Sequence, residues 1–178
     1  MTDTTLPSGN SWDPQRPRPI LSLLASLLVA GLVPRGMTAE GERRVAALTT
    51  VYRHNSHADV LVSRLLLTDL LDGTGRDSPL KLVSLYTDQR PPNDISRLLA
   101  ASHRFRLGAN IADTLTLGTG KLDVDGVLLI AEHGDYPHST TGNTRYPKRR
   151  FWDEMLQVFR QSGRVVPVFV DKQLADNW

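Results

Sequence analysis

Apolar residues occur along this chain in short continuous runs that alternate with amphipathic stretches. The continuous runs are rich in Val, Leu and Ile and are bounded by charged or turn residues, a pattern typical of strands buried on both faces. They predict strands at 43–52, 80–86, 125–131 and 164–170. The intervening stretches, with apolar residues at helical spacing, predict helices at 55–73, 91–105, 110–118 and 149–163.

Capping residues support the predicted helices. Ser56 and Asp59 fit a capping box at the start of the first helix, and Gly73 stands where its C-terminal cap belongs. Asn93 is the expected N-cap of the second helix. Because strands alternate with helices, the sequence predicts an α/β domain with a Rossmann-like, doubly wound and mainly parallel sheet covered by helices on both faces.

The first 39 residues have a different composition from the rest of the chain. A polar, proline-rich stretch at 1–19 precedes 14 uncharged residues at 20–33. A run of this length is too short for a comfortable membrane span and is typical of a signal-peptide core. We therefore expect a signal peptide or membrane-targeting leader at 1–39, an α/β domain at 40–178, and export to the periplasm or the extracellular space. An uncleaved anchor and a true start at Met37 are the alternatives.

Charge and cysteine content narrow the function classes. A formal net charge of +2 over 178 residues is too small to predict a nucleic-acid-binding surface, so a small molecule is the expected partner. The chain has no cysteine, which excludes a disulfide framework, a thiolate metal site and a thiol nucleophile.

Ionisable or strongly polar side chains follow each predicted strand. In an open α/β sheet, ligands bind beyond the carboxyl ends of the strands, so these side chains are the candidate site. The groups that follow the four strands in turn are Arg53, His54, Asn55, Ser56 and His57; Asp88; Glu132, His133 and Asp135; and Asp171 with Lys172. The long irregular segment at 132–148 is expected to be functional, because loops of this length are uncommon in compact domains.

Three segments carry a family resemblance. LYTD ends the second strand in Asp88; NIADTLTLGTGKLDVDGVLLIA reads as a short helix and an aspartate-led strand; and GRVVPVFVDKQLA ends the last strand in Asp171 and Lys172. In this order, over residues 43–176, they resemble the N-terminal domain of the glucose–fructose oxidoreductase/inositol dehydrogenase (Gfo/Idh/MocA) family, and in particular its uncharacterised exported bacterial relatives. Asp171 and Lys172 match the first two residues of the family's Glu-Lys-Pro motif, and Gln173 replaces the proline.

The resemblance implies an NAD- or NADP-binding oxidoreductase domain that acts on a sugar or polyol. In that interpretation Asp88 holds the adenosine ribose, and Lys172 and His133 work near the transferred hydride. Two departures stand out. The family's glycine-rich turn is replaced by TTVYRHNSH, which contains no glycine, although Arg53, Asn55 and Ser56 at the helix start can hold an anion. The family's second domain does not follow within the 178 residues, so we expect either a fragment of a longer protein or a domain that needs a partner, which would be that second domain or a second copy in a homo-oligomer.

The residues also permit other interpretations. Glu132 and His133 can act as an acid–base pair, because a carboxylate can orient an imidazole and raise its pKa. His54 and His57, with Glu132 and His133, can instead form a site for a divalent zinc, iron or manganese ion in a metal-dependent enzyme. A non-catalytic ligand-binding module is the remaining alternative. The glycine-free turn favours either of these last two alternatives over the oxidoreductase.

Overall fold

The protein folds around a five-stranded parallel sheet. The computed structural model describes residues 41–68, 70 and 74–174. In this part of the chain the strand order is β3-β2-β1-β4-β5, and every neighbouring pair is parallel. The strands are β1 (Arg43–Thr49), β2 (Leu80–Thr87), β3 (Arg106–Leu107), β4 (Gly126–Ile130) and β5 (Val168–Val170), and the helices are α1 (His57–Leu66), α2 (Ser96–His103), α3 (Ile111–Thr116) and α4 (Lys148–Ser162).

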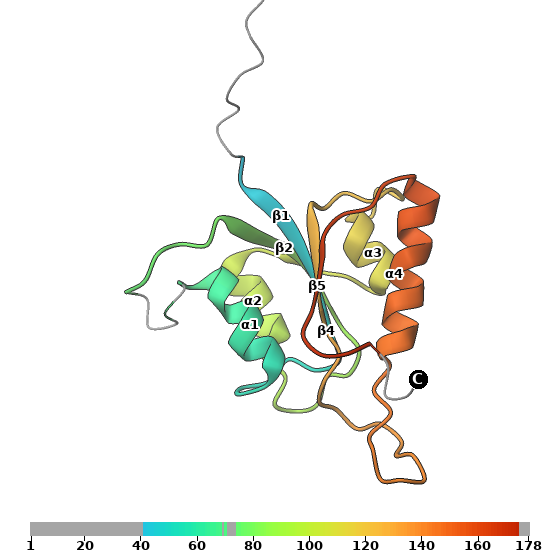
Figure 1. The fold of residues 1–178 in the computed structure, drawn as a ribbon. Coiled ribbons are helices and arrows are strands. Elements are labelled where there is room, and N and C mark those ends of the chain that lie inside the picture. The colour runs from blue at the N-terminus through green and yellow to red at the C-terminus, as the bar shows by residue number, and fades with distance from the viewer. Residues whose placement is uncertain (1–40, 69, 71–73, 175–178) are drawn as a thin grey trace, which may run out of the picture. The chain divides into compact units, whose positions relative to one another are not determined.

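The helices cover both faces of the sheet (Figure 1). Successive residues of β1 point to opposite faces, so Ala46 and Leu48 enter one core while Ala47 enters the other. The first core also contains Ile111 and Leu115 from α3 together with Phe151, Met155, Val158 and Phe159 from α4. The second core contains Ala58 and Val62 from α1, with residues of α2 packed at its edge. This arrangement confirms the predicted Rossmann-like, doubly wound fold.

Several predicted elements differ from the structure at their ends. The first helix was expected to reach residue 73, but α1 ends at Leu66; Gly73 lies outside the described residues. The last strand was expected from 164, but β5 begins at Val168. Pro167, which has no backbone N–H to donate, directly precedes it, and its carbonyl accepts from Val127.

The second helix and a short edge strand also differ from the prediction. The second helix was expected to start near Asn93, but the N-cap of α2 is Ile95, which makes no side-chain capping bond. β3 was not predicted at all, because its two residues are too few to produce a hydrophobic pattern. The expected leader at 1–39 lies outside the described residues. Among the residues that the structure describes, no helix is both long enough and apolar enough to cross a bilayer.

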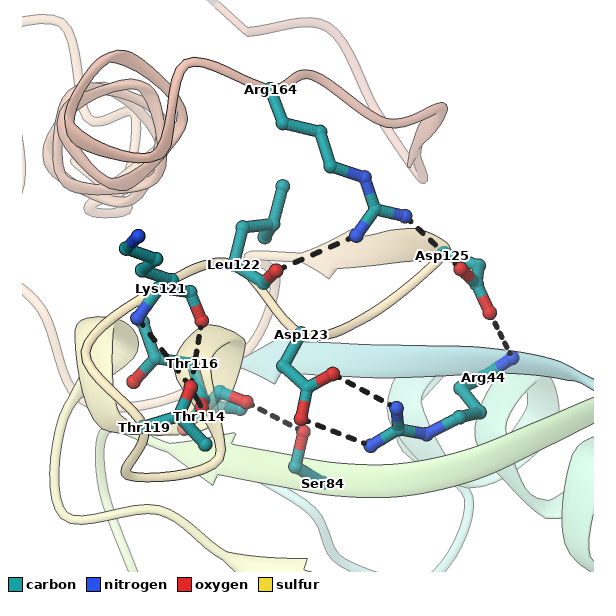
Figure 2. Close-up of polar contacts among 10 residues, drawn as sticks. All are labelled: Arg44, Ser84, Thr114, Thr116, Thr119, Lys121, Leu122, Asp123, Asp125 and Arg164. Atoms are coloured by element: carbon teal, nitrogen blue, oxygen red, sulfur yellow. Dashed lines mark hydrogen bonds and ion pairs between the residues drawn. The ribbon is translucent and has the colours of Figure 1, made fainter.

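Charged residues at the amino edge of the sheet bind one another (Figure 2). The Arg44 guanidinium donates to both Asp123 oxygens, at 3.0 and 3.4 Å, and the Arg44 backbone N–H donates to Asp125 at 3.0 Å. Arg164 reaches the other oxygen of Asp125 at 3.1 Å. The bond from Arg44, together with the Arg164 charge, outweighs the small effect of burial and lowers the pKa of Asp125. This edge therefore holds the starts of β1 and β4 together, and the candidate site lies at the opposite edge.

Candidate functional site

Backbone hydrogen bonds hold the carboxyl ends of the strands in one continuous edge. The N–H of Asp88 donates to Thr49 O at 3.0 Å, and the N–H of Asp171 donates to Leu129 O at 3.1 Å. The buried Thr50 hydroxyl donates to the carbonyl of Glu132, which connects the end of β1 to the loop after β4. The residues predicted from the four strand ends are thus carried by one rigid edge.

His57 and Asp171 form a short ionisable pair within this edge. His57 is the first residue of α1 and Asp171 directly follows β5, yet His57 Nδ1 lies 2.6 Å from Asp171 Oδ2. The Asp171 side chain is 14% exposed and the His57 side chain 35%. The carboxylate is therefore largely sheltered, whereas the imidazole keeps a solvent-facing part. The sequence placed both residues at strand ends but gave no sign that they pair.

His133 lies against this pair in a strained backbone conformation. Its φ is 68°, in the left-handed region that non-glycine residues rarely adopt, and its ring meets the His57 ring edge-on with centroids 4.7 Å apart. His133 Nδ1 is buried and has no hydrogen-bond partner among the described residues. Burial, followed by the charges of His57 and Arg53, lowers the pKa of His133 against the opposing effect of Glu132 and Asp171. His133 is consequently favoured as a neutral ring.

The carboxylate of Glu132 is bound by a lysine that the sequence analysis did not select. Lys148 Nζ, at the start of α4, lies 2.7 Å from Glu132 Oε1, and both side chains are mostly buried. Glu132 therefore has a cation as its direct partner, and it influences His133 only through its charge. The structure does not place the two in the direct pair that their adjacency in sequence suggested.

Asp88 is held by three donors from three parts of the chain. The Tyr86 hydroxyl and Arg150 Nη2 both donate to Oδ1 at 2.6 Å, and the Tyr136 hydroxyl donates to Oδ2 at 2.7 Å. We call these four residues the Asp88 cluster. Burial raises the pKa of Asp88, but the three hydrogen bonds and the Arg150 charge outweigh it and lower the pKa overall. Burial, together with the hydrogen bond to this carboxylate, raises the pKa of Tyr136.

The Asp88 cluster borders a shallow pocket at the ends of β2 and β3. Its volume is about 320 Å³, and its lining residues are Tyr86, Thr87, Asp88, Arg90, Gly108 and Ala109. Gly108 has no room for a side chain, because a Cβ there would lie 2.0 Å from Thr114 Oγ1. The lining combines a carboxylate and an arginine with the small residues Gly108 and Ala109, a set of groups suited to a polar ligand.

The residues predicted to face phosphates lie at the start of α1, as the sequence placed them. The Ser56 hydroxyl is fully buried and accepts from the N–H groups of Asp59 and Arg53, at 3.2 and 3.3 Å. This confirms Ser56 as the cap, although Asp59 accepts from the N–H of Asn55 rather than from that of Ser56. Asn55 has a φ of 59° and is exposed. Arg53 is partly buried, and its guanidinium bonds only to the carbonyl of His54 among the described residues.

The four residues of the metal hypothesis are not brought together. His54 is 83% exposed and pairs with Asp59 at 3.3 Å, while Glu132 pairs with Lys148. Only His57 and His133 lie side by side. Within the described ranges, no group of three His, Asp or Glu side chains has an arrangement suited to a metal ion. Lys172 is exposed beside Asp171, and no hydrogen bond or ion pair connects its side chain to the described part of the chain.

Comparisons with protein-family models, with curated proteins and with solved structures found no match for this chain. The resemblance to the Gfo/Idh/MocA family therefore stays a prediction.

Proposed function

We propose that this chain is the nucleotide-binding domain of an NAD- or NADP-dependent oxidoreductase that acts on a sugar or polyol. The observation that carries the proposal is the pocket beside Asp88 at the ends of β2 and β3, in a sheet of order β3-β2-β1-β4-β5. In sheets of this topology, dinucleotides bind along the carboxyl edge, and an acidic residue after the second strand accepts from the adenosine ribose.

Asp88 retains the capacity to accept such a hydrogen bond. Each carboxylate oxygen has two acceptor positions. Oδ1 already accepts from Tyr86 and Arg150, whereas Oδ2 accepts only from Tyr136 among the described residues. A ribose hydroxyl can therefore donate to Oδ2, and Arg90, which also lines the pocket, supplies positive charge for a phosphate. A nicotinamide, when bound, would accept a hydride from the substrate carbon.

A binding titration tests the proposal directly. Calorimetric titration of the full chain with NAD⁺ and NADP⁺ should show saturable binding of at least one of them. Asp88→Asn should weaken that binding about tenfold, because it removes a charged acceptor. Asp153→Asn, which changes an exposed carboxylate on α4, is the matched control and should leave the affinity unchanged. Absence of binding by both dinucleotides would reject the proposal.

The β1–α1 turn favours a second candidate, a non-catalytic nucleotide-binding module. Because the Ser56 hydroxyl is occupied by backbone N–H groups and the turn has no glycine, a pyrophosphate has less backbone to approach than in glycine-rich turns. This candidate predicts that AMP binds as tightly as NAD⁺. The oxidoreductase proposal predicts a clear preference for the dinucleotide, so the same titration with AMP distinguishes them.

A further inference from the structure

Side chains from three strand ends meet beside β4 and β5, away from the nucleotide pocket. His57 starts α1 after β1, His133 follows β4, and Asp171 follows β5. The distance from His57 Nδ1 to Asp171 Oδ2 is 2.6 Å, and the two imidazole rings lie 4.7 Å apart at an interplanar angle of 80°. This cluster shares no residue with the pocket beside Asp88.

The hydrogen bond determines which nitrogen of His57 is available. An ionised carboxylate only accepts, so the atom that faces Asp171, Nδ1, must carry the proton. In a neutral ring, Nε2 then has the free lone pair. The Asp171 carboxylate is mostly buried, so leaving it without a hydrogen-bond donor would destabilise the folded protein. This cost favours the His57 tautomer that carries its proton on Nδ1.

We infer that His57 is the proton acceptor of an acid–base site for a hydroxyl-bearing substrate, and that Asp171 is its positioning residue. In the reaction, the substrate hydroxyl transfers its proton to His57 Nε2. The C–H electron pair leaves with its hydrogen as hydride to an oxidised nicotinamide, and the substrate carbon becomes a carbonyl. The substrate alcohol is oxidised and the nicotinamide is reduced. The hydride step rests on the proposed function; the oriented base does not.

A structural ion pair would have the same heavy-atom distance but a different protonation state. In such a pair His57 would be an imidazolium with a proton on both nitrogens. The ionisable groups nearest to the ring are Asp171, whose Oδ2 lies 2.6 Å from Nδ1, and His133, whose ring centroid lies 4.7 Å away. The tautomer is therefore the property to measure.

Long-range proton–nitrogen NMR of the full chain, labelled at histidine nitrogens, measures it without a substrate. At neutral pH we expect His57 to have a protonated Nδ1 and an unprotonated Nε2, with the signals assigned by their loss in His57→Gln. Asp171→Asn should return the ring to the tautomer mixture of free histidine. Protonation of both nitrogens in the unaltered chain, or protonation of Nε2 alone, would overturn the inference.

Chemical acylation gives a second, independent readout. Diethylpyrocarbonate reacts with a free imidazole lone pair, and peptide mass spectrometry locates the product. His57 should be acylated several-fold faster in the unaltered chain than in Asp171→Asn, while the exposed His138 reacts equally in both. Equal rates at His57 in two folded proteins would contradict a positioning role for Asp171.

The two proposals fail in distinguishable ways. If NAD⁺ and NADP⁺ do not bind but Nε2 of His57 is unprotonated, the hydride step fails and the oriented base stands. If a dinucleotide binds and Nε2 is protonated, the proposed function stands and the base assigned here is wrong.

Discussion

His133 and Gly134 turn the chain sharply where it leaves β4. Their φ values are 68° and 107°, so two successive residues lie outside the ordinary backbone regions. A Cβ at position 134 would lie 2.7 Å from Cε2 of Tyr136 and 3.0 Å from Oε1 of Gln89. Glycine is therefore required at 134, and the turn delivers the Tyr136 hydroxyl to Asp88.

The strain at His133 leads to a prediction about stability. His133→Gly and His133→Ala both remove the imidazole, but only glycine adopts a positive φ without a steric penalty. The glycine variant should be more stable than the alanine variant by about 1 kcal/mol in urea unfolding. At His138, which does not have a positive φ, the same two substitutions should not favour glycine. Equal stability of the two variants at 133 would show that the turn relaxes.

At the residue scale, the sequence predicted locations but not partners. Residues after each strand were correctly expected at one edge, because parallel strands end together. The pairing of His57 with Asp171 spans 114 positions and depends on the angle at which α1 begins, which no local pattern encodes. Lys148 and Arg150 could not be selected from the sequence, because only the path of the preceding loop brings them to Glu132 and Asp88.

Capping residues predicted one helix start and missed another: Ser56 caps α1 as expected, whereas the N-cap of α2 is Ile95 and not Asn93. In the structure the Asn110 side chain also caps α3, by accepting from the N–H of Asp113 at 2.8 Å, and Gly163 ends α4 with a φ of 60°. The end of α1 was placed too late, because apolar residues at helical spacing continue past Leu66. β5 was placed too early, because an apolar run does not reveal that Pro167 interrupts pairing.

The cap of α1 supports a second prediction. Ser56→Ala leaves the N–H groups of Asp59 and Arg53 without their buried acceptor, so the free energy of unfolding should fall by about 1 to 2 kcal/mol. Hydrogen exchange at the Asp59 amide should rise with it. Ser102→Ala in α2, where an exposed hydroxyl donates to the Leu98 carbonyl, is the control and should change stability by less than about 0.5 kcal/mol. A comparable loss in both variants would contradict a special role for the Ser56 cap.

In the whole molecule, the Asp88 cluster ties together segments that are distant in sequence. It joins the end of β2 to Tyr136 in the loop after β4 and to Arg150 in α4. Gln89 adds two hydrogen bonds to the backbone of Asp135, at 2.7 and 2.8 Å.

The parallel sheet could be predicted because strands alternate with helices along the chain. The course of the loop at 132–148 could not, because it depends on contacts between side chains that are distant in sequence.

Because the pKa of Asp88 is lowered in the folded protein, the stabilisation that the Asp88 cluster contributes depends on pH. The pKa of Asp88 is lower in the folded chain than in the unfolded chain, where aspartates titrate near pH 3.9. As the pH falls, Asp88 is therefore protonated in the unfolded chain before it is protonated in the folded chain. The stabilisation is complete well above pH 4 and is lost as the pH falls through the lower pKa of the folded state. In Asp88→Asn this contribution is absent at every pH.

The free energy of unfolding should therefore differ most between the unaltered chain and Asp88→Asn near neutral pH, and the difference should shrink below about pH 4. Urea unfolding at a series of pH values measures it. Asp153→Asn is the control, because the exposed pair of Asp153 with Arg149 contributes little at any pH. Trypsin should also cut the loop at 132–148 faster in Asp88→Asn, because Tyr136 and Arg150 lose their ionised partner. A difference that stays constant with pH would mean that Asp88 stabilises the fold through its shape and neutral hydrogen bonds, and not through its charge.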